Sequence, residues 1–226
     1  MSAFKRINVA LVMEETGLVP LFYHPDVQVC MEVISACHAG GARVFEFTNR
    51  GDFAHEVFAE IRKWALDEFP DLMIGAGSVS DAPTAAIFMQ MGADFIVSPV
   101  LHPDVARVCN RRKVLWIPGC GTLTEIANAE ELGAEIVKIF PGSAVGGPSF
   151  VNAVKGPCPW TSIMPTGGVD PSEENLRKWF AAGVTCVGMG SGLITEKTVK
   201  DGDWKSLTQT VRTTLGTIRK LRSAAS

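Results

Sequence analysis

The sequence predicts an α/β protein that folds as a (β/α)8 TIM barrel with an extra helix before the first strand. The first observation is a recurring pattern in which an amphipathic stretch ends at a glycine and a short apolar run follows. It occurs at Gly40, Gly92, Gly133 and Gly183. Glycine suits the left-handed turn that closes a helix, and the run after it suits a strand. This alternation is typical of βα units around a parallel sheet.

Eight short apolar runs are the second observation, because each has the length of one strand. The predicted strands are residues 19–23, 44–48, 73–76, 95–98, 114–117, 136–140, 162–165 and 186–189. The predicted helices are residues 26–39, 53–68, 82–91, 103–110, 122–132 and 171–181, with a leading helix at 5–16 and a closing one at 204–221. A doubly wound open sheet is the competing topology, but no Gly-x-Gly-x-x-Gly follows the first strand.

Length and composition are the third observation. The chain has 226 residues, 46% of them hydrophobic, and no linker divides it, so we expect a single domain over residues 1–226. The net charge is −3 and both signs are mixed throughout, without a basic stripe, which argues against a nucleic-acid partner.

No membrane or secretory signal is evident. No apolar run is long enough to cross a bilayer, and residues 1–6 lack the apolar core of a signal peptide. The six cysteines form no Cys-x-x-Cys pair, so we expect free, mostly buried thiols. The expected location is the cytoplasm.

Lys138 stands in a segment where a barrel strand should be apolar. Four of the five residues from Ile136 to Phe140 are apolar, and Pro141 ends the run. An ammonium group in such a strand is costly to bury, and losing its proton makes the amine a nucleophile toward carbonyl carbon. The alternative is a structural lysine that reaches water at the strand end or pairs with a carboxylate.

The second predicted strand carries a polar face. Alternation places Glu46 and Thr48 on one face, and Arg50 continues the same parity beyond the strand. If this face and that of Lys138 both point inward, Glu46 and Lys138 share a cavity. Lys138 is then the candidate nucleophile, Glu46 the general acid/base and Arg50 the anchor for a substrate carboxylate. A structural ion pair that fills the barrel is the alternative.

Two glycine-rich loops predict a phosphate site. Gly167 and Gly168 follow the seventh predicted strand, and Gly190 and Ser191 follow the eighth. Glycines let backbone N–H groups approach a phosphate closely, and in barrels these two loops commonly form the phosphate site. The four histidines show no spacing typical of metal ligands, so no metal and no cofactor are expected.

The motifs together resemble the 2-keto-3-deoxy-6-phosphogluconate (KDPG) aldolases, including the related 4-hydroxy-2-oxoglutarate (KHG) aldolases. The likeness extends from Val19-Pro20 to Gly190-Ser191. Its most specific pieces are Phe45-Glu46-Phe47-Thr48-Asn49-Arg50, Gly75-Ala76-Gly77-Ser78-Val79, Ser98-Pro99, Ile117-Pro118-Gly119, Lys138-Ile139-Phe140-Pro141 and Pro165-Thr166-Gly167-Gly168-Val169.

The resemblance implies a metal-free class I aldolase that works as a homotrimer on a phosphorylated keto acid and pyruvate. Lys138 would form the Schiff base with the keto carbon of pyruvate, and Glu46 would move protons. Arg50, helped by Thr166, would hold the pyruvyl carboxylate. The other residues expected at the substrate are Thr48, Ser78, Pro99 and Phe140, with Gly167, Gly168, Gly190 and Ser191 at the phosphate.

Three departures from the family pattern affect the choice of substrate. Ser78 stands where the family usually has threonine, the first strand ends in Tyr23-His24 where many relatives have a basic residue, and the loop at residues 142–147 differs. The galactonate epimer of KDPG and KHG itself are therefore alternative substrates. Two other classes share the glycine loops without needing the lysine: a phosphate-binding barrel isomerase or thiamine-phosphate-synthase-like transferase, and a non-catalytic phosphosugar sensor.

Overall fold

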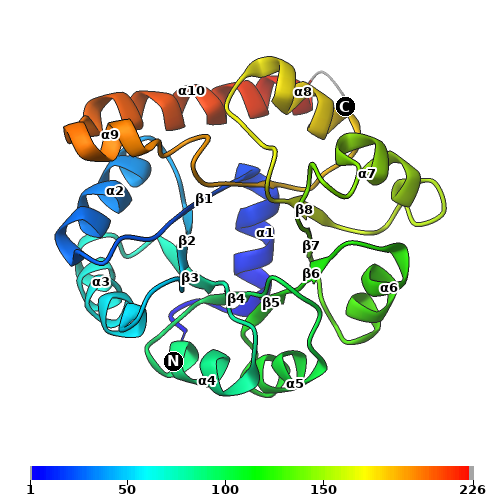
Figure 1. The fold of residues 1–226 in the computed structure, drawn as a ribbon, viewed down its shortest axis with the longest axis horizontal. Helices are drawn as coiled ribbons and strands as arrows, with labels where there is room; N and C mark the ends of the chain where they lie inside the picture. Colours follow the sequence, from blue (N-terminus) through cyan, green and yellow to red (C-terminus); the bar gives the residue numbers. More distant parts are fainter. Residues whose placement is uncertain (1, 224–226) are drawn as a thin grey trace.

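Parallel strands curl around a central axis and helices cover their outer side (Figure 1). The structure is a computed structural model, and it describes residues 2–223. One sheet has the order β5-β4-β3-β2-β1-β9 and the other β6-β7-β8. The strands are β1 (Leu18–Phe22), β2 (Val44–Thr48), β3 (Met73–Gly77), β4 (Phe95–Val97), β5 (Leu115–Ile117), β6 (Gly119–Cys120), β7 (Val137–Ile139), β8 (Ile163–Pro165) and β9 (Val187–Met189).

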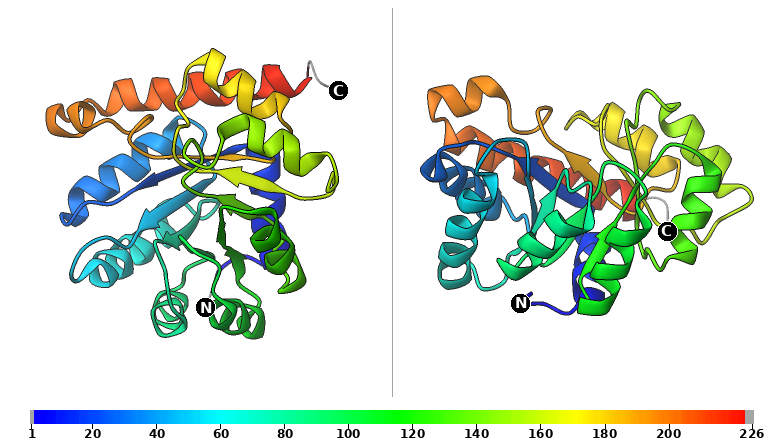
Figure 2. Two further views of the ribbon diagram at one scale, coloured as in Figure 1. Left: turned by 45° about the vertical axis from the view of Figure 1, so that its right-hand side comes forward. Right: turned by 60° about the horizontal axis from the view of Figure 1, so that its bottom comes forward.

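Helices follow the strands around the ring, and α1 precedes them (Figure 2). They are α1 (Arg6–Thr16), α2 (Val27–Ala39), α3 (Ala54–Glu68), α4 (Ala82–Gln90), α5 (Pro103–Arg112), α6 (Leu123–Glu131), α7 (Gly147–Lys155), α8 (Glu173–Ala181), α9 (Glu196–Asp201) and α10 (Trp204–Ser223). Within residues 2–223, none of these helices combines the length and apolarity that a membrane span requires.

The fifth predicted strand, residues 114–117, corresponds to β5, and Pro118 separates it from β6, a short strand that the prediction lacked. β5 pairs with β4, whereas β6 pairs with β7, and Pro118 lies between the two short strands. Proline has no N–H to donate to a ladder, so the hydrogen bonding changes partner there. The Pro118 carbonyl still accepts from the Lys138 N–H at 2.8 Å. An isolated bridge between Thr166 and Gly188 links β8 to β9 on the other side.

Two helices were absent from the sequence-based prediction. The segment after β7 was expected to be a loop at residues 142–147, but α7 begins at Gly147, and α9 follows β9. The loop agrees with the structure up to Gly146, and α7 was missed because its start, Gly146-Gly147-Pro148, has the composition of a turn. α9 is one short polar helix with no buried residue, so it has no apolar periodicity to detect.

α1 lies in the centre of the ring in the axial view (Figure 1). Its Val9 and Met13 are completely buried. They belong to a separate inner core with residues that lie mostly at or just before the starts of the strands: Val19, Val44, Met73, Phe95, Val97, Leu115, Ile117, Ile136, Met164 and Cys186. This helix therefore closes the amino-terminal end of the strands, and the opposite end is left for a site.

A buried ion pair joins α3 to the start of β4. Arg62 Nη2 lies 2.9 Å from Asp94 Oδ2, and both side chains are almost completely buried. Asp94 also accepts hydrogen bonds from the backbone N–H of Ile74 and Ala3 and from the Ser2 hydroxyl. One carboxylate thus ties the segment before α1 to β3, β4 and α3.

Replacing Asp94 with alanine should strongly destabilise the fold, because it leaves the Arg62 guanidinium buried without a counter-charge. The expected loss in the free energy of unfolding is about 3–5 kcal/mol. Urea unfolding followed by circular dichroism measures it. The control is Asp104→Ala, which removes an exposed ion pair with Arg107 and should cost about 1 kcal/mol or less. Equal losses for both variants would contradict a structural role for the buried pair.

Candidate active site

β2 carries Glu46 into the interior of the ring. The Glu46 side chain is 1% exposed, and Thr48 on the same face is also buried. Phe47, on the other face, packs against Phe58 of α3 with ring centroids 5.7 Å apart. The alternation predicted from the sequence is therefore confirmed. Glu46 lies over Gly77 of β3, where an added Cβ would overlap the Glu46 carboxylate.

The Glu46 carboxylate is incompletely satisfied. Its Oε2 atom is buried and has no hydrogen-bond partner among the described residues. A buried acceptor without a partner is costly unless a ligand supplies one. This atom therefore marks a place where a substrate hydroxyl or water could bind.

β7 holds Lys138 between a glycine and a methionine. Lys138 pairs with Gly119 of β6 and Met164 of β8, and its side chain is 5% exposed. The Nζ atom lies 4.7 Å from the centroid of the Phe140 ring. Gly119 leaves no side chain beside the lysine, and the Pro99 carbonyl occupies the space where its Cβ would be. The amine is thus buried and lies over one aromatic ring.

Burial acts on both groups in the direction that favours their neutral forms. It raises the pKa of Glu46 above its usual value, and the attraction of Lys138 and Arg50 opposes this. It lowers the pKa of Lys138, an effect that Glu46 opposes and Arg50 reinforces. No ion pair or hydrogen bond joins Lys138 to Glu46 within the described residues. The two side chains share the interior without forming a structural ion pair.

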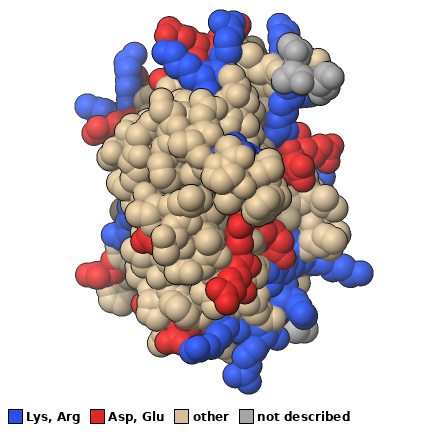
Figure 3. All heavy atoms as spheres, turned by 90° about the vertical axis from the view of Figure 1, so that its right-hand side faces the viewer, with Lys and Arg blue, Asp and Glu red and all other residues tan. Residues whose placement is uncertain are grey.

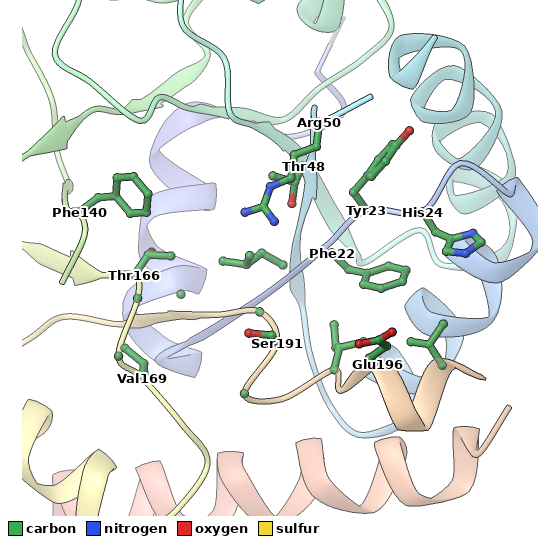
Figure 4. A pocket seen from close by; sticks show the side chains of 18 of the residues that line it. Phe22, Tyr23, His24, Thr48, Arg50, Phe140, Thr166, Val169, Ser191 and Glu196 are labelled. Atoms are coloured by element: carbon green, nitrogen blue, oxygen red, sulfur yellow. The ribbon is translucent and has the colours of Figure 1, made fainter. Parts of the chain in front are cut away.

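A cavity of about 770 Å³ opens at the carboxyl ends of the strands (Figure 4). Of the residues predicted at the site, eight line it: Thr48, Arg50, Phe140, Thr166, Gly167, Gly168, Gly190 and Ser191. Lys138 and Glu46 are not among its lining residues, but Phe140, which lines it, lies against the Lys138 amine. Ser78 and Pro99 are partly exposed near this end but do not line the cavity.

Arg50 points its guanidinium into the middle of the cavity (Figure 4). Its side chain is exposed, and among the described residues no hydrogen bond or ion pair fixes it. Across the cavity, Thr166 has a buried hydroxyl without a hydrogen-bond partner. Gly188 is required beside it, because a Cβ there would overlap the Thr166 Oγ1 atom. Arg50 and Thr166, whose hydroxyl has no hydrogen-bond partner among the described residues, therefore line the same cavity.

The loop after β8 forms a concave surface of backbone N–H groups. Gly167 and Gly168 have φ values of 90° and 79°, which glycine adopts without strain. Their carbonyls are used: Ser143 N–H donates to Gly167 O at 3.1 Å, and Asn175 Nδ2 donates to Gly168 O at 3.1 Å. No backbone carbonyl among residues 2–223 accepts from the N–H of Gly167, Gly168 or Ser191. These free donors suit an anion.

Eleven lining residues were missed by the sequence-based prediction, four of which carry polar side chains. Tyr23 and His24 come from the loop after β1, and Glu196 and Lys200 come from α9. The loop after β1 could have been found, because it ends at the same edge of the sheet as Arg50. α9 carried no such signal. Among residues 2–223, no group of three His, Cys, Asp or Glu side chains is arranged to hold a metal ion.

Comparison with known proteins places this arrangement in a family. The model of the KDPG and KHG aldolases matches residues 9–210 of the chain. The chain belongs to this family. The KDPG aldolase of Pseudoalteromonas atlantica is 33% identical over 198 residues, which are 88% of this chain and 89% of that protein. The KHG/KDPG aldolase of Escherichia coli K12 is 31% identical over 196 residues, 86% of this chain and 89% of that protein.

A solved structure from the same aldolase family has a similar fold. The KDPG aldolase of Legionella pneumophila, crystallised with pyruvate as a covalent carbinolamine intermediate, superposes with a TM-score of 0.81. It shares 26% identity, and the match covers 90% of this chain and 96% of that one. The observed fold is thus the curled parallel sheet of KDPG aldolases.

In this KDPG/KHG aldolase, the pKa of Lys138 should move in opposite directions when its two charged neighbours are removed. Glu46→Gln deletes an attraction that favours the ammonium, so the pKa of Lys138 should fall. Arg50→Ala deletes a repulsion, so it should rise. The pH dependence of Lys138 acetylation by limiting acetic anhydride, followed by peptide mass spectrometry, measures both shifts.

Surface Lys197 is the internal control for that titration, since its side chain is 89% exposed and it lies outside the strand interior. Its labelling profile should be the same in all three proteins. Shifts of Lys138 in the same direction for both variants would contradict the electrostatic arrangement described above.

Proposed function

We propose that the protein is a class I aldolase that cleaves KDPG to pyruvate and glyceraldehyde 3-phosphate. The observation that carries the proposal is a lysine amine, Lys138, buried in the same interior as a carboxylate, Glu46, whose Oε2 atom has no hydrogen-bond partner among residues 2–223. The carbinolamine with pyruvate in the L. pneumophila relative supports covalent chemistry at this amine.

The chemistry follows from the neutral amine that burial favours. Nζ of Lys138 attacks the C2 carbonyl, and loss of water from the carbinolamine gives an iminium ion. Cleavage of the C3–C4 bond sends its electron pair toward the iminium nitrogen and gives an enamine. The C4 hydroxyl loses its proton as the aldehyde forms. Protonation at C3 and hydrolysis then release pyruvate and restore the lysine.

Glu46 is the proposed general acid/base for these steps. Its raised pKa brings the carboxyl closer to neutral pH, where a group both accepts and returns protons efficiently. It would take the C4 hydroxyl proton during cleavage and help to expel water from the carbinolamine. The unpartnered Oε2 is available for both roles without breaking an existing hydrogen bond.

The remaining roles follow the lining of the cavity. Arg50 and the Thr166 hydroxyl would hold the pyruvyl carboxylate, with Thr48 and Phe140 beside the reacting carbons. The phosphate would bind the N–H groups of the loops that contain Gly167, Gly168, Gly190 and Ser191. Ser78 and Pro99 would line the end of the pocket that holds the pyruvyl group.

Closure of the sheet into a complete eight-stranded barrel, with α1 as its extra helix, belongs to the same proposal. The Thr166–Gly188 bridge and the change of partner at Pro118 support it, because they leave no wide gap between the two sheets. The single domain over residues 1–226 stays a prediction, and residues 1 and 224–226 lie outside the described residues.

A homotrimer is the assembly we propose. The face beside α6 and α7 carries few charged side chains over its centre (Figure 3). The sequence from Ile139 to Val169 contains one charged residue, Lys155, and an exposed tryptophan, Trp160. A charge-poor surface with an exposed aromatic side chain is typical of interfaces. The cytoplasmic location stays a prediction.

Borohydride reduction in the presence of pyruvate should attach pyruvate to Lys138. The adduct, measured by intact mass and located by peptide digestion, should be absent from Lys138→Arg, because a guanidinium cannot form the Schiff base. Labelling scattered over surface lysines, or aldolase activity retained by Lys138→Arg, would favour a phosphate-binding isomerase or a sensor instead.

Ser191→Asp should weaken the use of phosphorylated substrates selectively. The added carboxylate repels the phosphate, so KM for KDPG should rise by about tenfold or more, whereas decarboxylation of oxaloacetate should be spared. The control is Ser191→Ala, which removes the hydroxyl without adding charge and should have a smaller effect. Equal losses on both substrates for Ser191→Asp would contradict the phosphate cradle.

A further inference from the structure

Tyr23, the only tyrosine in the sequence, lies at the rim of the cavity. It is half-buried and follows β1 directly. Its ring meets the ring of Phe47 edge to face, with centroids 5.6 Å apart and an interplanar angle of 74°. Phe47 is completely buried on β2, next to Glu46 and Thr48. The tyrosine ring therefore rests on the strand that carries the site.

The phenol end of Tyr23 covers the backbone of Gly51. A Cβ added at Gly51 would overlap the Tyr23 Oη atom and lie 2.8 Å from Cζ. Gly51 has no left-handed φ, so this position needs glycine for space rather than for backbone freedom. The contact is a packing contact, because no hydrogen bond within residues 2–223 involves the Tyr23 hydroxyl.

Arg50 stands between two fixed backbone positions. On one side, the Asn49 N–H donates to Gly77 O at 2.9 Å, and on the other side Gly51 lies under Tyr23. The Gly51 carbonyl accepts from the Ala54 N–H at 3.2 Å at the start of α3. Among residues 2–223 no group holds the Arg50 guanidinium, which points into the cavity (Figure 4), so the backbone of this loop fixes where the side chain begins.

We propose that Tyr23 is a positioning residue that holds the loop at residues 49–51, so that the Arg50 guanidinium meets the substrate carboxylate. It acts through its ring and not through its hydroxyl. The inference rests on the proposed function, which makes Arg50 the carboxylate anchor. Small displacements of such an anchor reduce its effect greatly, because bidentate binding depends on geometry.

The test is the pyruvate concentration that half-saturates borohydride trapping at Lys138. Tyr23→Ala should raise it about tenfold, because the loop loses its cover and Arg50 is no longer aligned. Tyr23→Phe keeps the ring and should stay within about twofold of the native protein. The extent of trapping at saturating pyruvate and its location at Lys138 should be the same in all three proteins.

Two controls separate positioning from general stability. Phe69→Ala removes a comparable half-buried aromatic, one that packs edge to face on Trp64 with centroids 5.2 Å apart, far along α3 from the site. It should lower the melting temperature without changing the pyruvate concentration that half-saturates trapping. In an Arg50→Ala background, Tyr23→Ala should have no further effect on half-saturation, because it acts through Arg50.

A second variant tests the same contact from the other side. Gly51→Ala places a methyl group against the phenol and should also raise the half-saturating pyruvate concentration. Adding Tyr23→Phe removes the overlapping oxygen and should restore part of the loss. Additive effects of the two substitutions would overturn the proposal, as would unchanged half-saturation in Tyr23→Ala. Failure of the native protein to be trapped at Lys138 would instead overturn the proposed function.

Discussion

The site depends on one electrostatic constraint: a lysine and a glutamate are buried in the same apolar interior. Each charge is costly there, and each is stabilised by the other without direct contact. The cost of burial raises the pKa of Glu46 and lowers the pKa of Lys138 relative to exposed groups. A direct ion pair would stabilise the ammonium and suppress the nucleophile, so the separation of the two groups is as important as their burial.

Glycines create the space that this arrangement needs. Gly77 makes room for the Glu46 carboxylate, Gly119 makes room for the Pro99 carbonyl, and Gly188 accommodates the Thr166 hydroxyl. All three lie on strands, where glycine is otherwise unfavourable. A methyl group at any of them would overlap a polar atom of the site. Glycine is therefore needed at these positions, although it weakens the strands.

Sequence reasoning located the strands because each is a short apolar run, and it found the inward face of β2 because polar and apolar residues alternate there. It also recognised Lys138, since a charge inside an apolar run is conspicuous. It could not find α9 or the contact between Tyr23 and Gly51. α9 buries no side chain, and the contact joins residues 28 positions apart whose proximity depends on the pairing of β1 with β2. The sequence shows a proline at position 118, but it does not show that β5 pairs with β4 and β6 with β7 on either side of it.

The two ends of the strands differ in how much packing and buried charge they contain. At the amino-terminal end, α1 and the Arg62–Asp94 pair concentrate hydrophobic packing and buried charge. At the other end, Arg50, α9 and the loop after β1 are exposed or half-buried, although Tyr23 of that loop packs on Phe47. Sequence change is therefore tolerated unequally. Substitutions at the mouth of the cavity can change which keto acid binds without unfolding the protein. The substrate of this fold can therefore change more easily than its reaction.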